Sequence, residues 1–147
     1  MRIRPASRLI ILDPKDRVLL YRFVHRSGPL AGCDYWHTPG GGLEADENFE
    51  AGAVRELREE TGLVVDDIGP AIGHRNFILT LPDGERVEAQ ERFFRVRVDT
   101  RALSFGGLSA LELELLEDHR WWSTTEIAET DETIYPEDIL SLLTGYA

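Results

Sequence analysis

Three glutamates at helical spacing are the residues of this chain with the clearest capacity for chemistry. Glu59 and Glu60 follow Glu56 by three and four positions, and residues at those separations are neighbours on an α-helix. Carboxylates held that close repel one another unless a cation lies among them, and a hard divalent ion such as Mg2+ prefers oxygen ligands. Acidic runs are also common on solvated helix faces, so the metal interpretation depends on the surrounding residues.

A helix is predicted around these glutamates. Apolar residues recur every three or four positions, at Phe49, Ala53, Val54 and Leu57, which is one stripe of an amphipathic helix. Gly62 is expected to end the helix, because glycine adopts the left-handed conformation without a Cβ clash. Gly52 is unfavourable within it, since alanine would serve a helix better by about 1 kcal/mol.

The whole stretch from Gly41 to Leu63 resembles the signature of the Nudix hydrolases. It has Gly41 and Glu47, and then the run Arg55-Glu56-Leu57-Arg58-Glu59-Glu60-Thr61-Gly62-Leu63, at the separations that this signature requires. The preceding Trp36-x-x-Pro39-Gly40-Gly41 is similar to the usual approach to this Nudix box. A chance match at every defining position is rare.

The resemblance implies an α/β fold, a Nudix-type α/β/α sandwich with a central mixed β-sheet, over one domain of residues 1–147. The box helix would cover one side of the sheet and the C-terminal helix the other. Turn residues between apolar runs predict two hairpins, with strands over 7–12 and 17–23, and over 72–81 and 86–98. Val64 and Val65 are expected to start a strand. The C-terminal helix is expected over 135–143, with Pro136 in its first turn.

The resemblance also implies separate roles for the box residues in binding metal, orienting the carboxylates and maintaining the structure. Mg2+, for which Mn2+ can substitute, would bind Glu56, Glu59, Glu60 and the carbonyl oxygen of Gly40. Arg55 would orient these catalytic carboxylates with Glu47 as its partner; the alternative is a surface ion pair of little energetic weight. Gly41, Glu47 and Gly62 would have structural roles.

Further site residues are expected outside the box. The general base is left open between Glu56 and Glu117, with Glu114 and Glu112 as further candidates; residues 110–116 suit a strand or a short helix equally. Arg22 lies at a strand end whose counterpart in Nudix enzymes often contacts substrate phosphate. Arg75 and Glu91 are also predicted substrate contacts, because strands at their place often line the substrate cleft of these enzymes. Each of the three is also an ordinary residue for a half-exposed strand. His37 is interpreted as a packing or surface residue.

Composition narrows the classes of function. A net charge of −11 disfavours nucleic-acid polymers as partners, although arginines near a metal can still attract a small phosphorylated substrate. The single Cys33 excludes an intramolecular disulfide, and no Cys/His cluster suggests zinc. The apolar run 9–12 is too short for a signal sequence or a membrane span. A cytoplasmic protein is expected, with no membrane partner and with a homodimer left open.

The predicted activity is therefore Mg2+-dependent hydrolysis of a nucleoside diphosphate linked to another group. The favoured substrate is a (deoxy)nucleoside triphosphate, including an oxidised one, because the downstream motifs of several other Nudix subfamilies are missing from their usual places. The alternatives are hydrolysis of a nucleotide sugar or a dinucleoside polyphosphate, and a non-catalytic Nudix-fold module that binds a nucleotide. A binding module usually has a degraded box, whereas all the carboxylates are present here.

Overall fold

The computed structural model describes the backbone of residues 1–99 and 116–144 and the side chains of residues 1–99 and 118–143. Within this part of the chain, the helices are α1 (Phe49–Thr61), α3 (Thr124–Glu129) and α4 (Ile139–Thr144). The strands are β1 (Ile3–Leu12), β2 (Val18–Val24), β3 (Asp34–His37), β4 (Gly40–Gly42), β5 (Gly73–Thr80), β6 (Arg86–Arg97), β7 (Leu116–Trp122) and β8 (Ile134–Tyr135).

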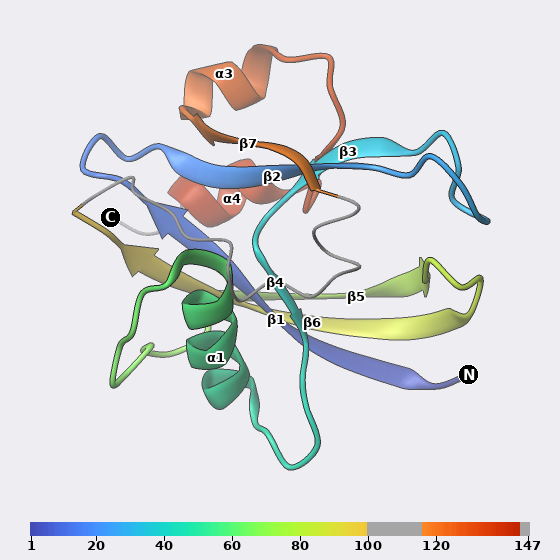
Figure 1. The fold of residues 1–147 in the computed structure, drawn as a ribbon. Coiled ribbons are helices and arrows are strands. Elements are labelled where there is room, and N and C mark those ends of the chain that lie inside the picture. The colour runs from blue at the N-terminus through green and yellow to red at the C-terminus, as the bar shows by residue number, and fades with distance from the viewer. Residues whose placement is uncertain (100–115, 145–147) are drawn as a thin grey trace.

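The described strands form one mixed sheet in the order β5-β6-β1-β2-β3-β8 (Figure 1). Two further strands pair outside this path, β4 with β1 and β7 with β2. The β1–β6 and β3–β8 pairs are parallel and the remaining pairs antiparallel. The antiparallel β4 pairing sets Gly40 beside Arg8 and Gly42 beside Ala6, so the approach to the box lies directly against the first strand.

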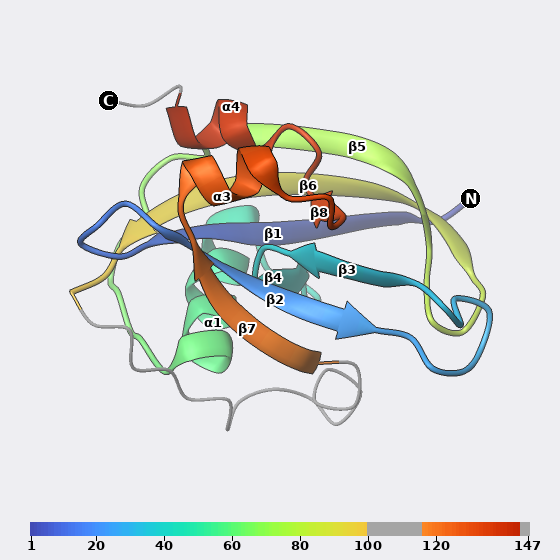
Figure 2. The ribbon, with the colours of Figure 1, turned by 90° about the horizontal axis from the view of Figure 1, so that it is seen from above.

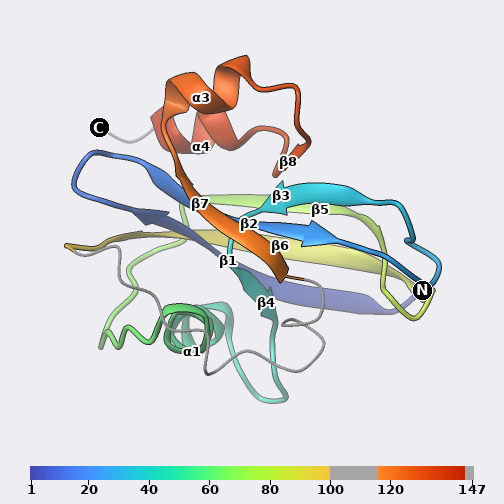
Figure 3. The ribbon, with the colours of Figure 1, turned by 45° about the horizontal axis from the view of Figure 1, so that its top comes forward.

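The sheet is covered by helices on both faces. Figure 3 shows α1 below the sheet and α3 with α4 above it, and Figure 2 shows α3 and α4 side by side. Alternate residues of β1 supply both cores, since successive side chains of a strand point to opposite faces. Leu9 and Ile11 pack with Leu57 of α1, whereas Ile10 and Leu12 pack with Ile139 of α4. The predicted α/β/α sandwich is confirmed.

Local sequence signals account for the box helix. The side-chain oxygen of Asn48 accepts a hydrogen bond from the backbone N–H of Ala51 at 2.7 Å, which caps the start of α1. Gly62 ends the helix in the left-handed conformation, with φ of 82°, and its N–H donates to the carbonyl of Arg58. The predicted helix end at Gly62 is confirmed.

Gly52 lies inside α1 and packs closely against the preceding loop. Gly52 is buried, and a Cβ there would lie 2.3 Å from Leu43 Cδ2 and 3.2 Å from both Glu47 Oε1 and Ser7 Oγ. Glycine is therefore what allows α1 to approach the loop that carries Glu47.

Two predicted elements are corrected. Val64 and Val65 form no strand, and the Val64 side chain is 74% exposed, because the chain runs over the surface after α1 without a partner strand. The C-terminal helix begins at Ile139, not at residue 135, because Ile134 and Tyr135 pair with the edge of β3 as β8.

The two predicted hairpins are confirmed, with β1 starting four residues early at Ile3 where it pairs with β6. The segment 110–115 lies outside the described residues.

Candidate active site

Arg55 is the centre of the box. Its Nε and Nη2 donate to the two carboxylate oxygens of Glu47 at 2.8 and 2.9 Å. Its Nη1 donates to Glu56 Oε1 at 3.0 Å and to Glu59 Oε2 at 3.1 Å, and Nη2 also donates to the Gly42 carbonyl at 3.0 Å. The hydrogen bonds with Glu47 raise the pKa of Arg55, and the same bonds lower the pKa of Glu47. One guanidinium thus connects the helix, the acidic turn and β4.

The box carboxylates lie at different depths. Glu56 and Glu60 are buried, whereas the Glu59 side chain is 29% exposed. Tyr21 of β2 donates its hydroxyl to the backbone carbonyl of Glu60 at 2.8 Å, which fixes the end of α1 against the sheet. Buried carboxylates persist only with partners or cations, and Arg55 is such a partner for Glu56.

The glycines of β4 provide space for charged groups. A Cβ on Gly41 would lie 2.8 Å from Glu56 Oε1, and one on Gly40 would lie 2.2 Å from the carbonyl oxygen of Ser7. Gly40 also has φ of +135°, a conformation that side chains disfavour. Its carbonyl oxygen accepts a hydrogen bond from Arg8 Nη1 at 3.2 Å. Gly40 and Gly41 are therefore fixed as glycine by the close approach of β1 and Glu56.

The carboxylates of the box lie among cationic side chains. Within residues 1–99 and 118–143, no three acidic, histidine or cysteine side chains are grouped as a metal site by themselves. Arg55 Nη1 donates to both Glu56 and Glu59, and the charges of Glu56 and Glu60 help to raise the pKa of Arg8. Carboxylate and carbonyl oxygens gathered around positive charge are the ligands that Mg2+ accepts.

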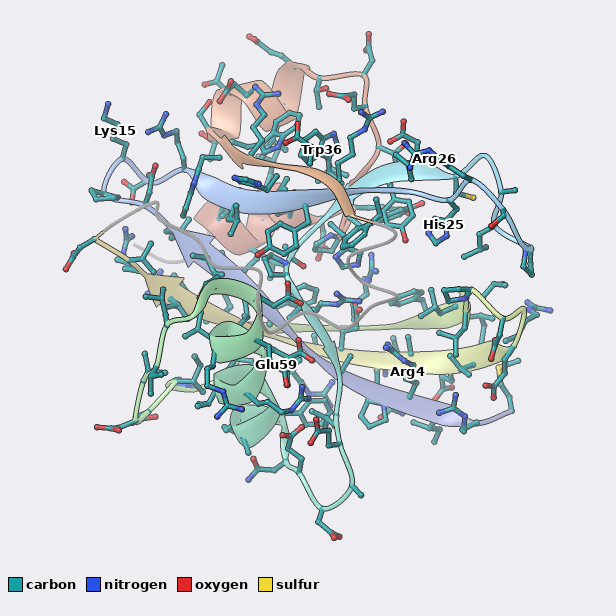
Figure 4. All side chains as sticks on the ribbon, viewed as in Figure 1. Arg4, Lys15, His25, Arg26, Trp36 and Glu59 are labelled. Atoms are coloured by element: carbon teal, nitrogen blue, oxygen red, sulfur yellow. The ribbon has the colours of Figure 1, made fainter. Side chains whose placement is uncertain are left out.

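Arginines of β1 and β5 lie around Glu91 of β6. Arg8 Nε donates to Glu91 Oε2 at 2.8 Å, and Arg75 Nη2 lies 3.3 Å from Glu91 Oε1. Burial opposes the charge of Arg8, but Glu91 more than offsets it and the pKa of Arg8 is raised. Arg4 has no ion pair among the described residues, and burial together with Arg8 lowers its pKa. In Figure 4, Arg4 of β1 and Glu59 of α1 lie on opposite sides of β4.

Comparison with known proteins decides the family. A family profile described as NUDIX domain matches residues 2–143. The chain belongs to the NUDIX family. The predicted family is confirmed, and the segment from Gly41 to Leu63 is the Nudix box of this chain.

The sequences of individual relatives align with part or with most of this chain. An RNA pyrophosphohydrolase of Teredinibacter turnerae is 38% identical over 65 residues, which are 44% of this chain and only 34% of that protein. One from Caulobacter vibrioides is 28% identical over 157 aligned positions, covering 98% of this chain and 87% of that protein. The structure of the MutT protein from Methanosarcina mazei Go1 has a TM-score of 0.70 at 24% identity, covering 97% of this chain and 91% of that one, and shows the shared fold.

The predicted substrate contacts and general bases outside the Nudix box lie in separate parts of the structure. Arg75 and Glu91 form an ion pair on neighbouring strands, and Glu91 is joined through Arg8 to Gly40. Arg22 forms its ion pair with Asp34. Glu117 lies in β7, but its side chain is outside the described part of the chain, as are Glu112 and Glu114. The roles of all these residues remain predictions.

The prediction from sequence missed Arg4 and Arg8. Both lie on one face of β1, with Ala6 between them, and the period of two along the strand would have placed them together. His37 is 8% exposed, as the packing interpretation requires, and its Nδ1 lies 3.1 Å from Thr38 Oγ1. Burial, then Arg8 and Arg75, lower its pKa well below the usual value.

No helix in the described part of the chain is both long and apolar enough to span a membrane.

Proposed function

We propose that this chain is a Mg2+-dependent hydrolase of the pyrophosphate linkage in a nucleoside diphosphate bound to another group, with a (deoxy)nucleoside triphosphate as the favoured substrate. The observation that carries this proposal is the set of contacts of Arg55 with Glu47, Glu56, Glu59 and the Gly42 carbonyl. A binding module would not need its carboxylates fixed by four hydrogen bonds from one guanidinium. The names of the relatives, RNA pyrophosphohydrolase, support the same bond type.

The box residues would hold the metal. Glu56, Glu59, Glu60 and the Gly40 carbonyl supply oxygen ligands for Mg2+, for which Mn2+ can substitute. When bound, such an ion neutralises phosphate charge and lowers the pKa of a water for in-line attack at phosphorus. Arg55 keeps Glu56 and Glu59 in place through hydrogen bonds from its Nη1, because a planar guanidinium donates to carboxylates in a fixed geometry. The proton of the attacking water passes to a carboxylate, for which Glu56 and Glu117 both remain candidates.

The arginines of β1 would attract the polyphosphate. The chain has a net charge of −11, so an anionic substrate requires local positive charge. Arg4 provides it, because its guanidinium has no ion pair among the described residues and lies against Gly42, where a Cβ would be 3.2 Å from Arg4 Nη2. A free guanidinium at the edge of the box suits a phosphate group beyond the pyrophosphate itself, as a triphosphate has.

A second candidate substrate is the 5′-triphosphate end of an RNA. The relatives that carry the name RNA pyrophosphohydrolase favour it, and the reacting group is the same as in a free nucleoside triphosphate. The net charge of −11 opposes extensive contact with a polyanion. A substrate of this class would therefore bind through its terminal nucleotides.

A substrate panel tests the proposal. The purified protein is incubated with Mg2+ and separately with deoxynucleoside triphosphates, their 8-oxo forms, a nucleotide sugar, a dinucleoside polyphosphate, ADP-ribose and a triphosphorylated oligoribonucleotide. Phosphate and pyrophosphate release are measured, with the Glu59→Gln protein as the control. We expect the highest kcat/KM for a free triphosphate. Hydrolysis of none of these compounds would support the non-catalytic binding module instead.

A further inference from the structure

Three buried polar side-chain atoms in the described part of the chain have no hydrogen-bond partner, and two of them lie on facing residues of β5 and β6. Arg75 Nε and Glu91 Oε1 are both buried, and neither has a hydrogen-bond partner, although Arg75 Nη2 lies 3.3 Å from that same oxygen. Glu91 is fully buried and the Arg75 side chain is 20% exposed. Leaving a buried donor or acceptor without a partner costs free energy. A donor and an acceptor left without partners on facing residues of β5 and β6 indicate a ligand that has the complementary pair.

Aromatic rings border this pair. The Arg75 guanidinium lies 4.0 Å from the centre of the Phe77 ring and 5.7 Å from the centre of the Tyr135 ring. Tyr135 in turn contacts Tyr35, with ring centres 5.5 Å apart, and His37 at 6.0 Å. Phe77 belongs to β5 and Tyr135 to β8, at the two ends of the sheet path, so the rings approach from different strands. A site bordered by aromatic rings suits a ligand with a planar, neutral ring.

The pair is connected to the Nudix box. Glu91 Oε2 accepts a hydrogen bond from Arg8 Nε at 2.8 Å, and Arg8 Nη1 donates to the Gly40 carbonyl at 3.2 Å. Gly40 is also the proposed metal ligand. Arg8 and Glu91 thus separate the unpaired atoms from the place where pyrophosphate would react. A nucleotide bound with its phosphates at Gly40 would reach toward Arg75 with its other end.

A phosphate group does not suit the Arg75 end. Glu91 places a carboxylate 3.3 Å from the guanidinium, and a phosphate anion there would be repelled by it. Arg4 has no ion pair within residues 1–99 and 118–143, so it is the better phosphate contact. A neutral heterocycle avoids this repulsion and can donate to Glu91 Oε1 while accepting from Arg75 Nε.

We propose that Arg75 and Glu91 bind the nucleobase of the substrate. They would contact an edge of the base that presents a hydrogen-bond donor beside an acceptor, and Phe77 and Tyr135 would lie along the ring of the base. Adenine has such an edge in its 6-amino group and the neighbouring ring nitrogen. The two residues are then specificity-determining and not catalytic. This inference rests on the proposed function, because it assumes a nucleotide ligand.

Binding without metal tests the inference separately from hydrolysis. Calorimetric titrations with AMP, purine riboside 5′-monophosphate and inorganic pyrophosphate are done on the unmodified protein, on Arg75→Met and on Arg86→Met, an exposed arginine of the same hairpin. Purine riboside lacks the 6-amino donor, so its monophosphate is expected to bind the unmodified protein about 10-fold more weakly than AMP. Arg75→Met is expected to weaken AMP about 10-fold and to leave pyrophosphate unchanged, and Arg86→Met to change neither.

The outcomes separate the two proposals. Equal weakening of AMP and pyrophosphate by Arg75→Met would make Arg75 a phosphate contact and overturn the inference. Equal affinity of the unmodified protein for AMP and purine riboside monophosphate would also overturn it, without depending on whether a variant folds. If AMP binds with the expected dependence on Arg75 but no nucleotide is hydrolysed, the base site stands and the proposed hydrolase fails.

Discussion

Arg55 and Glu47 are joined by two parallel hydrogen bonds, from Nε to Oε2 at 2.8 Å and from Nη2 to Oε1 at 2.9 Å. Both side chains are largely buried, with 12% and 13% exposed. An exposed ion pair contributes under about 1 kcal/mol, but a buried two-bonded pair fixes direction as well as charge. The guanidinium plane set by Glu47 decides where Nη1 meets Glu56 and Glu59.

Arg55→Lys is expected to lower kcat strongly. An ammonium group is a point donor and cannot make two parallel bonds to Glu47 while also holding Glu56 and Glu59. Displacement of the liganding carboxylates by about 1 Å can cost roughly 10²-fold in rate. Steady-state kinetics with Mg2+ measures the effect, and Arg58→Lys on the exposed face of α1 is the control. Unchanged kcat and unchanged Mg2+ dependence in Arg55→Lys would show that the pair is only structural.

Divalent ions are expected to stabilise the fold and to be required for turnover. A ligand that binds only the native state adds about 2.7 kcal/mol of stability at 100 times its Kd, and the buried Glu56 and Glu60 gain a cation. Thermal unfolding with and without Mg2+ should show a higher Tm with the ion. Full activity in excess EDTA would exclude the proposed metal site.

Glu59→Gln and Glu60→Gln are expected to lower kcat by at least about 10²-fold, because each keeps the side-chain shape while removing an anionic ligand. The matched control is Glu50→Gln in the exposed first turn of the same helix. Circular dichroism verifies that the variants are folded. Wild-type turnover of any hydrolysed nucleotide by both variants would mean that these glutamates do not hold the metal.

Features determined by neighbouring residues could be predicted from the sequence. The end of α1 at Gly62 and the two hairpins follow from residues that are adjacent along the chain, so periodicity and turn chemistry place them. The contact between Arg55 and Glu47 was within reach for the same reason, since both lie in the box.

Features that depend on distant segments could not be predicted. Ile134 and Tyr135 form β8 because they pair with the edge of β3, which is distant in sequence. The local sequence of residues 134–139 carries no signal of this pairing. Arg8 could not be recognised from its local sequence, because the register of β1 with β4 and β6 is what places it between Gly40 and Glu91. The need for glycine at position 52 likewise arises from Leu43, which packs on it from the preceding loop.

Gly52→Ala is expected to destabilise the protein, although alanine is the better helix former. The new Cβ would lie 2.3 Å from Leu43 Cδ2, and overpacking in a filled interior costs about 1–3 kcal/mol, more than the roughly 1 kcal/mol gained in propensity. Urea unfolding measures the change, with Glu50→Ala as an exposed control on the same helix. A variant as stable as the parent would mean that Leu43 moves aside freely.

Acidification below pH 6.5 is expected to reduce stability through His37. Burial, Arg8 and Arg75 hold its pKa well below the usual value, so the folded protein keeps His37 neutral where the unfolded chain takes up a proton at about 6.5. The unfolded state then binds more protons, and the free energy of unfolding falls as pH drops from 6.5 toward the folded pKa. Above pH 6.5 both states are neutral and this contribution is constant.

The matched comparison is His37→Gln against His74→Gln, an exposed histidine of β5. Urea unfolding of both variants and the parent from pH 7.5 to 5.0 should give a shallower loss of stability for His37→Gln and a parental slope for His74→Gln. Some slope remains, because burial also lowers the pKa of His25. Parallel pH profiles for all three proteins would show that His37 takes up its proton in the folded state, against the desolvation and the two arginines that oppose it.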